Sequence, residues 1–484
     1  MIYPELSAWL ESDDSIPCVL FEVQGHYQGS EQVFYFSTLP YVTEVGEFPA
    51  NTAYLAVASG GGLSESVDIS GGVTVGFGTL ELENTDGALD HLPSVVWSNR
   101  KFSAYLGDPR WPKSEFKLIQ AGYVDAMDAK NRDSLTLRLR DNLQALNYPL
   151  SEAKLANADE TFIPLSFGDL SNVTPILSDP QTLTYKVHTG PVADIEEVRD
   201  NGVPVGFTKN LPAGEFTLNN SPVGNITASV RGDSAEGYAD SAGELILRMA
   251  AGFNPDHKLS AEELDTSNIS AFVSTHPHCV GAYYDSRVNI LSAINQLAGS
   301  LFASAYMSRL GKLRMLRLSP PSGTPVAFIS QGNIVQGSFA IKDMPSVEPS
   351  VRVAYNRNYT VQESLTTGIP ERHKQQWQED WKHRTAKDDT AVALHRLFDE
   401  PEAVETALQI GSEAQQVAQW RVDLLGTQRV IYGCRVIGSA ALLEVGDVVT
   451  LAYPRYGLES GVLARVMSCG PNWSDKTADL ELLV

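Results

Sequence analysis

Three side chains near the middle of the chain could bind a metal ion. His276, His278 and Cys279 lie close together in the stretch STHPHCVG, and imidazole nitrogens and a thiolate are common ligands of zinc. Their spacing of i, i+2 and i+3 matches no standard zinc motif, and no fourth ligand is evident. We therefore expect these residues to have a structural or loop role, and we assign no metal ligands.

Carboxylates could also do chemistry, because glycosidases use two of them. Adjacent acidic pairs occur at Glu262-Glu263, Glu379-Asp380 and Asp388-Asp389, and Trp377 and Trp381 could form an aromatic face for sugar stacking. Neighbours in sequence rarely face each other across a substrate, and aromatic residues four apart more often pack against another element. The acidic pairs are therefore predicted to be solvated charges and the tryptophans to be packing residues.

Motifs that hold a nucleophile or a phosphate are absent. No G-x-S-x-G pattern occurs, so no nucleophile elbow is predicted. The stretch GGVTVGFG has neither the lysine of a phosphate-binding loop nor the third glycine of a dinucleotide fingerprint. We expect no catalytic residues and no cofactor, and the chain is predicted not to be an enzyme.

Length and composition indicate a multidomain globular protein. A chain of 484 residues corresponds to about three or four domains, and 43% hydrophobic with 20% charged residues is typical of folded proteins. The N-terminal stretch has no basic n-region or long apolar h-region, and no apolar run reaches the roughly 18 residues of a membrane span. We expect a soluble chain made in a cytoplasm, without a membrane-spanning segment.

The four cysteines, Cys18, Cys279, Cys434 and Cys469, are scattered along the chain. This distribution fits neither a disulfide framework nor a CxxC metal site. They are predicted to be buried thiols, because free cysteine behaves as a small hydrophobic residue.

Negative charge is concentrated at the start of the chain. The net charge is −23, and the first 99 residues contain 14 acidic residues but no lysine or arginine, the first basic residue being Arg100. Such a region should repel phosphate backbones, so tight or sequence-specific nucleic-acid binding is not expected. It could be a solvated surface or a wall past which a polyanion moves, and composition does not choose between the two.

Hydrophobic periodicity indicates β structure in the first half of the chain. TLELEN places Leu80 and Leu82 between polar residues, and SLTLRLRD alternates in the same way, which is the pattern of half-buried strands. Residues 148 to 238 continue with short β segments, and Asn201-Gly202 predicts a two-residue hairpin turn. We expect a barrel or sandwich followed by a small β module.

Near residue 243 the hydrophobic periodicity changes from that of strands to that of a helix. DSRVNILSAINQLAGSLF predicts a helix with Asp285 or Ser286 as N-cap, and FASAYMSRLGKLRMLRL predicts a hairpin that turns at Arg309 to Lys312. Beyond it, VRVAYNRNYTV is expected to form a strand, the charged residues 371–389 a polar linker, and residues 402–425 a helix. The chain then closes on strands, including a hairpin in which Val448, Leu451, Val462 and Val466 would fill a barrel core.

A weak internal repeat links the two ends of the chain. Residues 122–139 and 461–483 both run from a glycine through a strand with valines and a polar turn containing aspartate to alternating leucines. Such a pattern suggests that one β unit occurs twice.

The order of these segments resembles the baseplate-hub or tail-tip hub proteins of tailed bacteriophages. The resemblance extends from about residue 75 to the C-terminus and is carried by five stretches: residues 100–150, VTPILSDPQTLTYKVH, VGAYYDSRVNILSAINQLAGSLFASAYMSRLGKLRMLRL, VRVAYNRNYTVQ and LEVGDVVTLAYPRYGLESG. None of them is catalytic. Unlike certain tail-tip proteins, the chain has no clustered cysteines for an iron–sulfur centre, and no fused lysozyme or peptidase is evident.

The resemblance implies a mainly β, multidomain fold with α+β modules and two tube-like β-barrels. The expected domains are an N-terminal tube-like barrel at 1–150, a small β module at 151–240, an α+β module at 241–345, and a C-terminal domain with a helix and the second barrel at 346–484. In such a hub a homotrimer presents six similar units to a six-fold tube, and the repeat would be a trace of the two barrels.

The resemblance also implies partners and a location. The expected partners are two further copies of the chain, the distal tail or tail tube protein, the tape measure protein, and a central tail fibre or spike. Genomic DNA would pass through the lumen without sequence-specific binding, and the protein would be assembled in the bacterial cytoplasm and reside at the virion tail tip. Two alternatives stay open: a tail-associated enzyme that degrades glycan or peptidoglycan, and the hub of a related contractile secretion apparatus.

Overall fold

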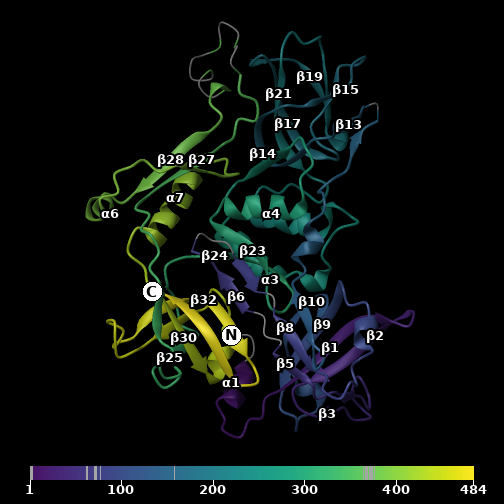
Figure 1. Ribbon diagram of the computed structural model, residues 1–484. Helices are drawn as coiled ribbons and strands as arrows, with labels where there is room; N and C mark the ends of the chain where they lie inside the picture. The colour runs from purple at the N-terminus through teal and green to yellow at the C-terminus, as the bar shows by residue number, and fades with distance from the viewer. Residues whose placement is uncertain are drawn as a thin grey trace.

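The computed structural model describes residues 4–60, 64–69, 73–76, 78–156, 158–362, 365, 369, 374 and 377–484. It is mainly β and consists of several packed sheets with a few helices, as expected from the sequence. Two barrels lie side by side at one end of the molecule, at the bottom of Figure 1, and a small β module lies at the other end. Within the described ranges, no helix is both long enough and apolar enough to cross a bilayer.

The N-terminal barrel is a seven-stranded sheet. In spatial order its strands are β2 (Ser30–Ser37), β1 (Cys18–Tyr27), β9 (Arg100–Gly107), β10 (Lys117–Asn131), β11 (Ser134–Arg140), β8 (Thr79–Glu83) and β5 (Ala58–Gly60). The segment that leads into β5 closes the barrel, because the Leu55 N–H donates to Tyr35 O at 3.0 Å and the Ser37 N–H donates to Leu55 O at 2.8 Å. The predicted alternation in β8 and β11 is confirmed, with Leu80, Leu82 and Leu137 buried.

The C-terminal barrel contains the hairpin expected near the end of the chain. In spatial order its strands are β25 (Ala327–Ile329), β31 (Val448–Leu451), β32 (Val462–Asn472), β33 (Thr477–Leu483), β30 (Ile431–Ile437) and β26 (Ala340–Asp343). One short segment joins the two sides of this sheet, because Ile329 pairs with Leu451 and Ile334 forms a bridge with Val436. Val448, Leu451 and Val466 are buried in the core and Val462 is partly buried against it.

The two barrels have the same strand order. When β2 is left out, each barrel has six strands, in chain order β1, β5, β8, β9, β10 and β11 in the first and β25, β26, β30, β31, β32 and β33 in the second. In both barrels the first strand pairs with the fourth, the fourth with the fifth, and the fifth with the sixth. The sixth strand then pairs with the third, and the third with the second. One pairing differs, since β1 is antiparallel to β9 whereas β25 is parallel to β31. The weak repeat in the sequence therefore corresponds to a repeated topology.

The small β module has two sheets around its own core. The five-stranded sheet contains β18 (Val203–Pro204), β17 (Val192–Asp200), β21 (Ile226–Asp233), β14 (Leu165–Val173) and β22 (Gly281–Tyr284), and the four-stranded sheet contains β15 (Ile176–Asp179), β16 (Thr184–Lys186), β20 (Glu215–Leu218) and β19 (Phe207–Asn210). Asn201 and Gly202 both have positive φ and connect β17 to β18, which confirms the predicted turn. A Cβ at Gly281 would lie 1.8 Å from Asp169 O, so β14 and β22 can approach this closely only with glycine there.

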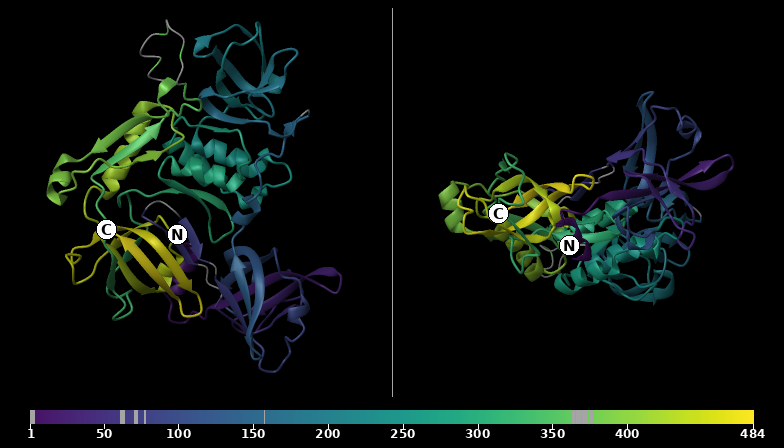
Figure 2. Two further views of the ribbon diagram at one scale, coloured as in Figure 1. Left: turned by 45° about the horizontal axis from the view of Figure 1, so that its top comes forward. Right: turned by 90° about the horizontal axis from the view of Figure 1, so that it is seen from below.

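Helices and a short hairpin form the middle of the molecule (Figures 1 and 2). The elements are α2 (Ala242–Arg248), α3 (Thr266–Thr275), α4 (Ile290–Gly299), β23 (Ala303–Met307) and β24 (Leu313–Arg317). The helix in 285–302 and the turn at 309–312 are thus confirmed. The predicted N-cap is wrong: α4 begins after Asn289, because residues 285–288 continue the loop from β22.

A three-stranded sheet flanks these helices and shares their core. Its elements are β28 (Lys382–Lys387), β27 (Ser350–Tyr355) and β29 (Ala403–Glu405), with α6 (Asp389–His395) and α7 (Gly411–Leu425). The strand predicted at 351–361 is confirmed for β27. The helix predicted from Glu402 begins only at Gly411, because residues 403–405 pair in parallel with β27. Residues 382–387 of the predicted linker form β28, and residues 371–373, 375 and 376 lie outside the described residues.

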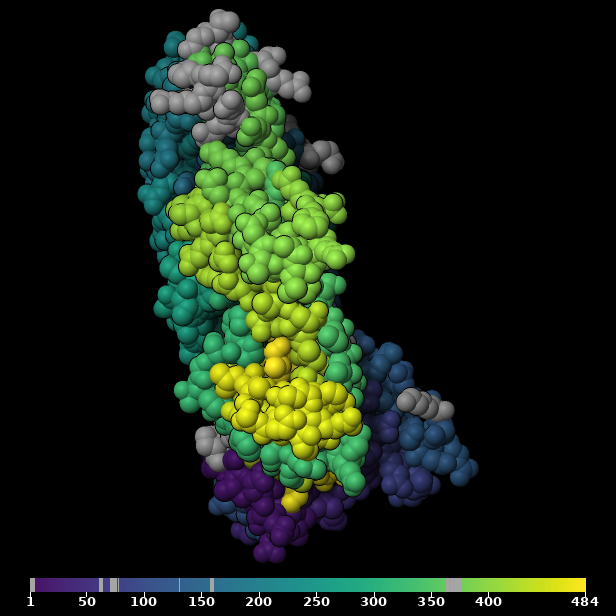
Figure 3. All heavy atoms as spheres, turned by 90° about the vertical axis from the view of Figure 1, so that its left-hand side faces the viewer, coloured from purple at the N-terminus to yellow at the C-terminus, as the bar shows by residue number. Residues whose placement is uncertain are grey.

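The strands and cores divide the chain differently from the expected domain ranges. Strands β25 and β26 precede residue 346 but pair within the C-terminal barrel, whereas β27 to α7 pack with the central helices. In the side view of Figure 3, the C-terminal barrel lies below this flanking sheet and next to the N-terminal segment.

Candidate functional site

A hairpin from the N-terminal barrel crosses to the C-terminal barrel. It consists of β6 (Ser64–Val67) and β7 (Val73–Gly76), which follow β5 in the chain. Strand β6 does not return to its own sheet but pairs with β32, where Ser66 lies opposite Ser468 and Glu65 opposite Cys469. The two barrels are therefore connected through backbone pairing as well as through side-chain packing.

Glu65 is a buried carboxylate at this crossing. Its side chain is only 2% exposed and accepts a hydrogen bond from the Arg309 N–H at 2.5 Å. Burial raises the pKa of Glu65 above its usual value, although the nearby Arg309 charge opposes this shift. Arg309 is also buried and donates to Leu442 O at 2.9 Å. The hairpin, the β23–β24 turn and the C-terminal barrel are therefore fixed to one another at this point.

The N-terminal segment makes a second connection between the barrels. Helix α1 (Pro4–Leu10) buries Leu6 and Leu10 in a core that is continuous through both barrels. On the C-terminal barrel, Glu11 accepts hydrogen bonds from the backbone and hydroxyl of Ser439 at 2.8 and 2.5 Å. On the N-terminal barrel, the Trp9 indole donates to Asp108 at 3.3 Å. The paired barrels thus form one unit with two connections.

The same irregularity occurs at the same place in both barrels. In β10 the pairing register shifts between Val124 and Ala126, and in β32 it shifts between Val466 and Ser468. Each valine lies opposite a leucine of the following strand before the shift. A β-bulge bends its strand and increases the local twist, so the two barrels curve at equivalent positions.

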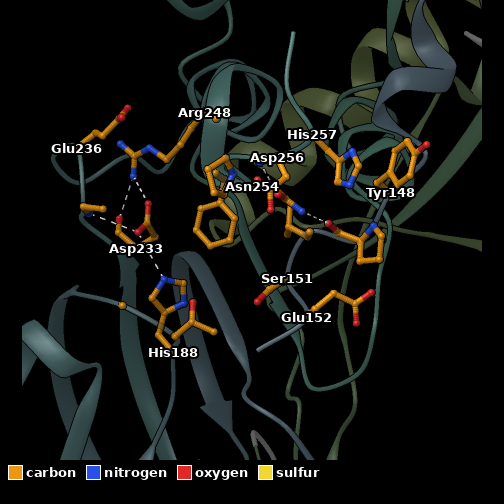
Figure 4. Close-up of a pocket in the computed structure, with 18 of the residues that line it drawn as sticks. Tyr148, Ser151, Glu152, His188, Asp233, Glu236, Arg248, Asn254, Asp256 and His257 are labelled. Atoms are coloured by element: carbon orange, nitrogen blue, oxygen red, sulfur yellow. Dashed lines mark hydrogen bonds and ion pairs between the residues drawn. The ribbon is translucent and has the colours of Figure 1, made fainter. Parts of the chain in front are cut away.

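A cleft of about 560 Å³ lies between the small β module and the central helices. Figure 4 shows His188, Asp233 and Arg248 on one side of it. His188 and Asp233 are each 1% exposed, with His188 Nε2 3.4 Å from Asp233 Oδ1. The Arg248 guanidinium donates to Asp233 Oδ2 at 2.7 Å. Burial alone would raise the pKa of Asp233, but its hydrogen bonds from His188 and Arg248 hold the pKa below the usual value.

This histidine and aspartate do not activate a nucleophile. The Ser166 N–H donates to His188 Nδ1 at 3.0 Å, so Nδ1 is an acceptor and Nε2 carries the proton toward Asp233. The Ser166 hydroxyl donates to Val187 O at 2.8 Å, away from the imidazole. The group therefore has the arrangement of a buried structural network, in which each member positions the next.

The opposite wall of the cleft has a different composition. The rings of Tyr148 and His257 are stacked with centroids 3.7 Å apart and planes 4° apart. Glu152 and Arg287 form an exposed ion pair at 2.7 Å, and the Asn254 side chain donates to Pro149 O at 2.7 Å. Figure 4 shows Tyr148 and His257 side by side across the cleft from His188. This wall presents flat rings and amide groups, which suit a polar ligand.

The three residues first considered as metal ligands pack against neighbouring elements, with His278 buried and with His276 and Cys279 half-buried. His276 stacks on Phe272 with centroids 4.3 Å apart and accepts a hydrogen bond from Arg317 Nε at 2.9 Å. Burial lowers the pKa of His276 to about 4, so it is neutral at pH 7. His278 lies against Trp420 on α7, and the Cys279 N–H donates to Glu413. Among the residues that the structure describes, no group of three or more His, Cys, Asp or Glu side chains is placed to hold a metal.

The other residues considered from sequence are dispersed. Glu263 closes a capping box with Ser260, and Asp388 caps α6. Trp377 is 6% exposed and lies beside the Arg199 guanidinium, in agreement with a packing role. All four cysteines are free. Cys18, Cys434 and Cys469 are buried as predicted, whereas Cys279 is only half-buried. Burial raises the pKa of Cys18 to about 11 and that of Cys434 to about 12.

Sequence reasoning missed Glu65 and the His188–Asp233 network. The only local signal for Glu65 was its position in SESVDI, where it alternates with serines on what reads as a half-polar strand. His188 and Asp233 are 45 positions apart in the sequence, and neither belongs to a motif.

Comparison with known proteins gives similarity only at the level of structure. No protein-family model and no curated protein matches the chain. The solved structures that are similar include the tail protein from Neisseria meningitidis MC58, at 11% identity over 97% of this chain and 96% of that chain, with a TM-score of 0.38. The 43 kDa tail protein of prophage MuSo2 from Shewanella oneidensis has 8% identity, with 97% and 96% covered and a TM-score of 0.41.

A third similar structure is the prophage tail protein gp18 from Listeria monocytogenes EGD-e, at 10% identity over 97% of this chain and 94% of that chain, with a TM-score of 0.43. The neighbours are thus tail proteins. Values this low do not transfer a function, so the role of this chain has to follow from its own geometry.

Proposed function

We propose that the chain is a structural virion protein, the central hub of a phage tail tip. The observation that carries the proposal is the pair of barrels with one strand order and one bulge position in a single chain. A chain with two equivalent units can meet a six-fold partner as a trimer, because three copies then present six similar units. A catalytic role would need no such duplication.

The connections between the barrels support this assembly. A platform that contacts a ring must hold its units at a fixed spacing, and the β6–β7 hairpin and the α1 segment fix one barrel to the other. We infer that the barrel faces contact the distal tail or tail tube protein, and that the tape measure protein and a central fibre or spike bind along the same axis.

The acidic N-terminal region has a role in this proposal. Eleven of its 14 acidic residues have exposed side chains: Glu5, Glu11, Asp13, Asp14, Glu31, Glu44, Asp68, Glu81, Glu83, Asp86 and Asp90. If the N-terminal barrels surround the axis of a trimer, these carboxylates repel the DNA backbone within a Debye length of about 8 Å. DNA would then pass through during ejection without adhering.

The stoichiometry of the purified chain tests the proposal. Sedimentation velocity at micromolar concentration should give a species of about three times the 52.6 kDa chain mass. A closed dimer or tetramer would contradict it. If the isolated chain is a monomer, cryo-electron microscopy of the particle that contains it decides: the proposal requires three copies around the tail axis at the tip, and any other position or copy number overturns it.

A further inference from the structure

A row of three cavities runs along one side of the molecule. Their volumes are about 560, 570 and 520 Å³. The first and second share Tyr148, Asp256 and His257 in their walls, and the second and third share Asn99, Arg140 and Gln144. The row thus extends from the cleft beside the small β module to the N-terminal barrel.

One segment, residues 138–152, contributes to all three cavities. This segment is anchored to the protein core, because Leu146 and Leu150 are fully buried. The Leu150 N–H donates to Val288 O at 2.8 Å, and the Ile290 N–H donates to Tyr148 O at 2.9 Å. The walls are therefore formed before any ligand arrives, which lowers the entropic cost of binding.

The walls carry no net charge, although the chain as a whole carries −23. Five basic side chains line the row, namely Arg138, Arg140, Arg248, Lys258 and Arg287, and five acidic ones, namely Asp125, Glu152, Asp233, Glu236 and Asp256. Several of these pair with each other, as Arg248 does with Asp233. A row with balanced charge gives no electrostatic advantage to a polyanion, so nucleic acid is not its ligand.

The other wall residues include side-chain amides and flat rings, together with small, aliphatic and hydroxyl residues such as Pro191, Leu139 and Thr189. Asn99, Gln144 and Asn147 are exposed. The Asn99 amide oxygen accepts from the Arg140 guanidinium and the Asn147 amide oxygen accepts from the Asn289 side chain. These two amides therefore present N–H donors to a ligand, and Gln144 presents both donors and an acceptor. Tyr123, Tyr148 and His257 add rings with an apolar face and a polar edge. A ligand that matches both features must alternate apolar faces with hydroxyl and amide groups along a neutral chain.

We propose that this row binds a neutral oligosaccharide rich in N-acetylated sugars. Acetamido groups pair with side-chain amides as both donor and acceptor, and the apolar face of a sugar ring fits against Tyr148. Tyr148 is 45% exposed, although His257 covers part of it. The site would hold the glycan without cleaving it, and this inference does not depend on the hub assignment.

Isothermal titration of the full-length chain with chitohexaose tests the proposal. We expect saturable binding that does not change with salt and that Tyr148→Ala weakens about tenfold, the equivalent of about 1.4 kcal/mol. Gln144→Ala, a smaller change at an exposed position, should also weaken binding. Tyr456→Ala is the matched control, because Tyr456 is 48% exposed but lies on the C-terminal barrel outside the row; it should leave the affinity unchanged.

Several outcomes would overturn the proposal. They are no heat of binding at millimolar chitohexaose, wild-type affinity in both the Tyr148→Ala and the Gln144→Ala variant, or tighter binding of a neutral peptide such as decaproline. New reducing ends in the titrated sugar would also overturn it, since the row would then be a catalytic site. Should Tyr148→Ala not melt cooperatively, Gln144→Ala and Tyr148→Phe replace it, with the first expected to weaken binding and the second to retain it.

Discussion

Asp233 is the best-defined buried charge at the residue scale. It is 1% exposed and bonded to both His188 and Arg248. Removing one member of a buried ion pair leaves the other charge unpaired, so Asp233→Asn should lower the free energy of unfolding at pH 7 by roughly 3 kcal/mol. Glu236→Gln is the control, because Glu236 lines the same cleft with an exposed side chain and should cost less than about 0.5 kcal/mol. Urea unfolding followed by tryptophan fluorescence measures both.

The loss of stability caused by Asp233→Asn should depend on pH in a defined direction. Since the folded pKa of Asp233 is lowered, its stabilisation is present above the unfolded value of 3.8 and is lost as the pH falls through the folded pKa. The stability gap between the wild type and Asp233→Asn should therefore narrow below about pH 4. A gap that stays constant down to the acid limit of folding would refute the assigned pairing.

Glu65 should show the opposite dependence. Because burial raises its folded pKa, its contribution is fully present below the unfolded value of 4.5 and is lost as the pH rises through the folded pKa. Glu65→Gln retains an oxygen that can accept from Arg309 N. The variant should therefore gain stability relative to the wild type as the pH rises above about 4.5. Glu459 is an exposed carboxylate on the same barrel, so the stability of Glu459→Gln relative to the wild type should not change with pH. The same pH-independent result for Glu65→Gln would contradict the raised pKa of Glu65.

At the scale of elements, the two barrels should respond as one unit. Leu137 and Leu480 occupy equivalent positions, each opposite the strand that carries the bulge, and both belong to one continuous core. Replacing either by alanine should cost about 2 to 5 kcal/mol. Hydrogen exchange measured by mass spectrometry should show faster exchange in both barrels for each variant. Leu170→Ala, in the separate core of the small β module, should accelerate exchange mainly there. Exchange confined to the mutated barrel would mean that the barrels unfold independently.

The presence of individual strands and helices could be predicted from the sequence, but the pairing of strands far apart in the chain could not. The alternating leucines of β8 and β11 and the helical spacing in α4 are local signals, and the structure confirms them. The crossing of β6 to β32 rests on Ser66 and Glu65 meeting residues some 400 positions away, and no local pattern encodes that. The late start of α7 also depends on a pairing between distant residues. Residues 403–405 pair with β27 and form a strand, although the sequence around them predicts a helix.

At the scale of the whole molecule, the charge distribution makes the proposed trimer sensitive to salt. Eleven exposed carboxylates in the first 99 residues of each chain would repel one another around a shared axis. Raising the ionic strength from about 0.05 M to about 0.5 M shortens the Debye length from roughly 14 Å to roughly 4 Å. The trimer should therefore dissociate less at high salt, as measured by sedimentation velocity across a concentration series.

A pair of neutralising variants separates this effect from general charge screening. Glu81 and Glu83 project outward from β8 and are both exposed, so Glu81→Gln with Glu83→Gln should strengthen the trimer at low salt and reduce its salt dependence. Glu262→Gln with Glu459→Gln changes the net charge equally at exposed positions outside the acidic region and should have a smaller effect. An equal response of the two double variants would mean that the acidic region lies away from the trimer axis, because screening of net charge alone does not depend on where the carboxylates are.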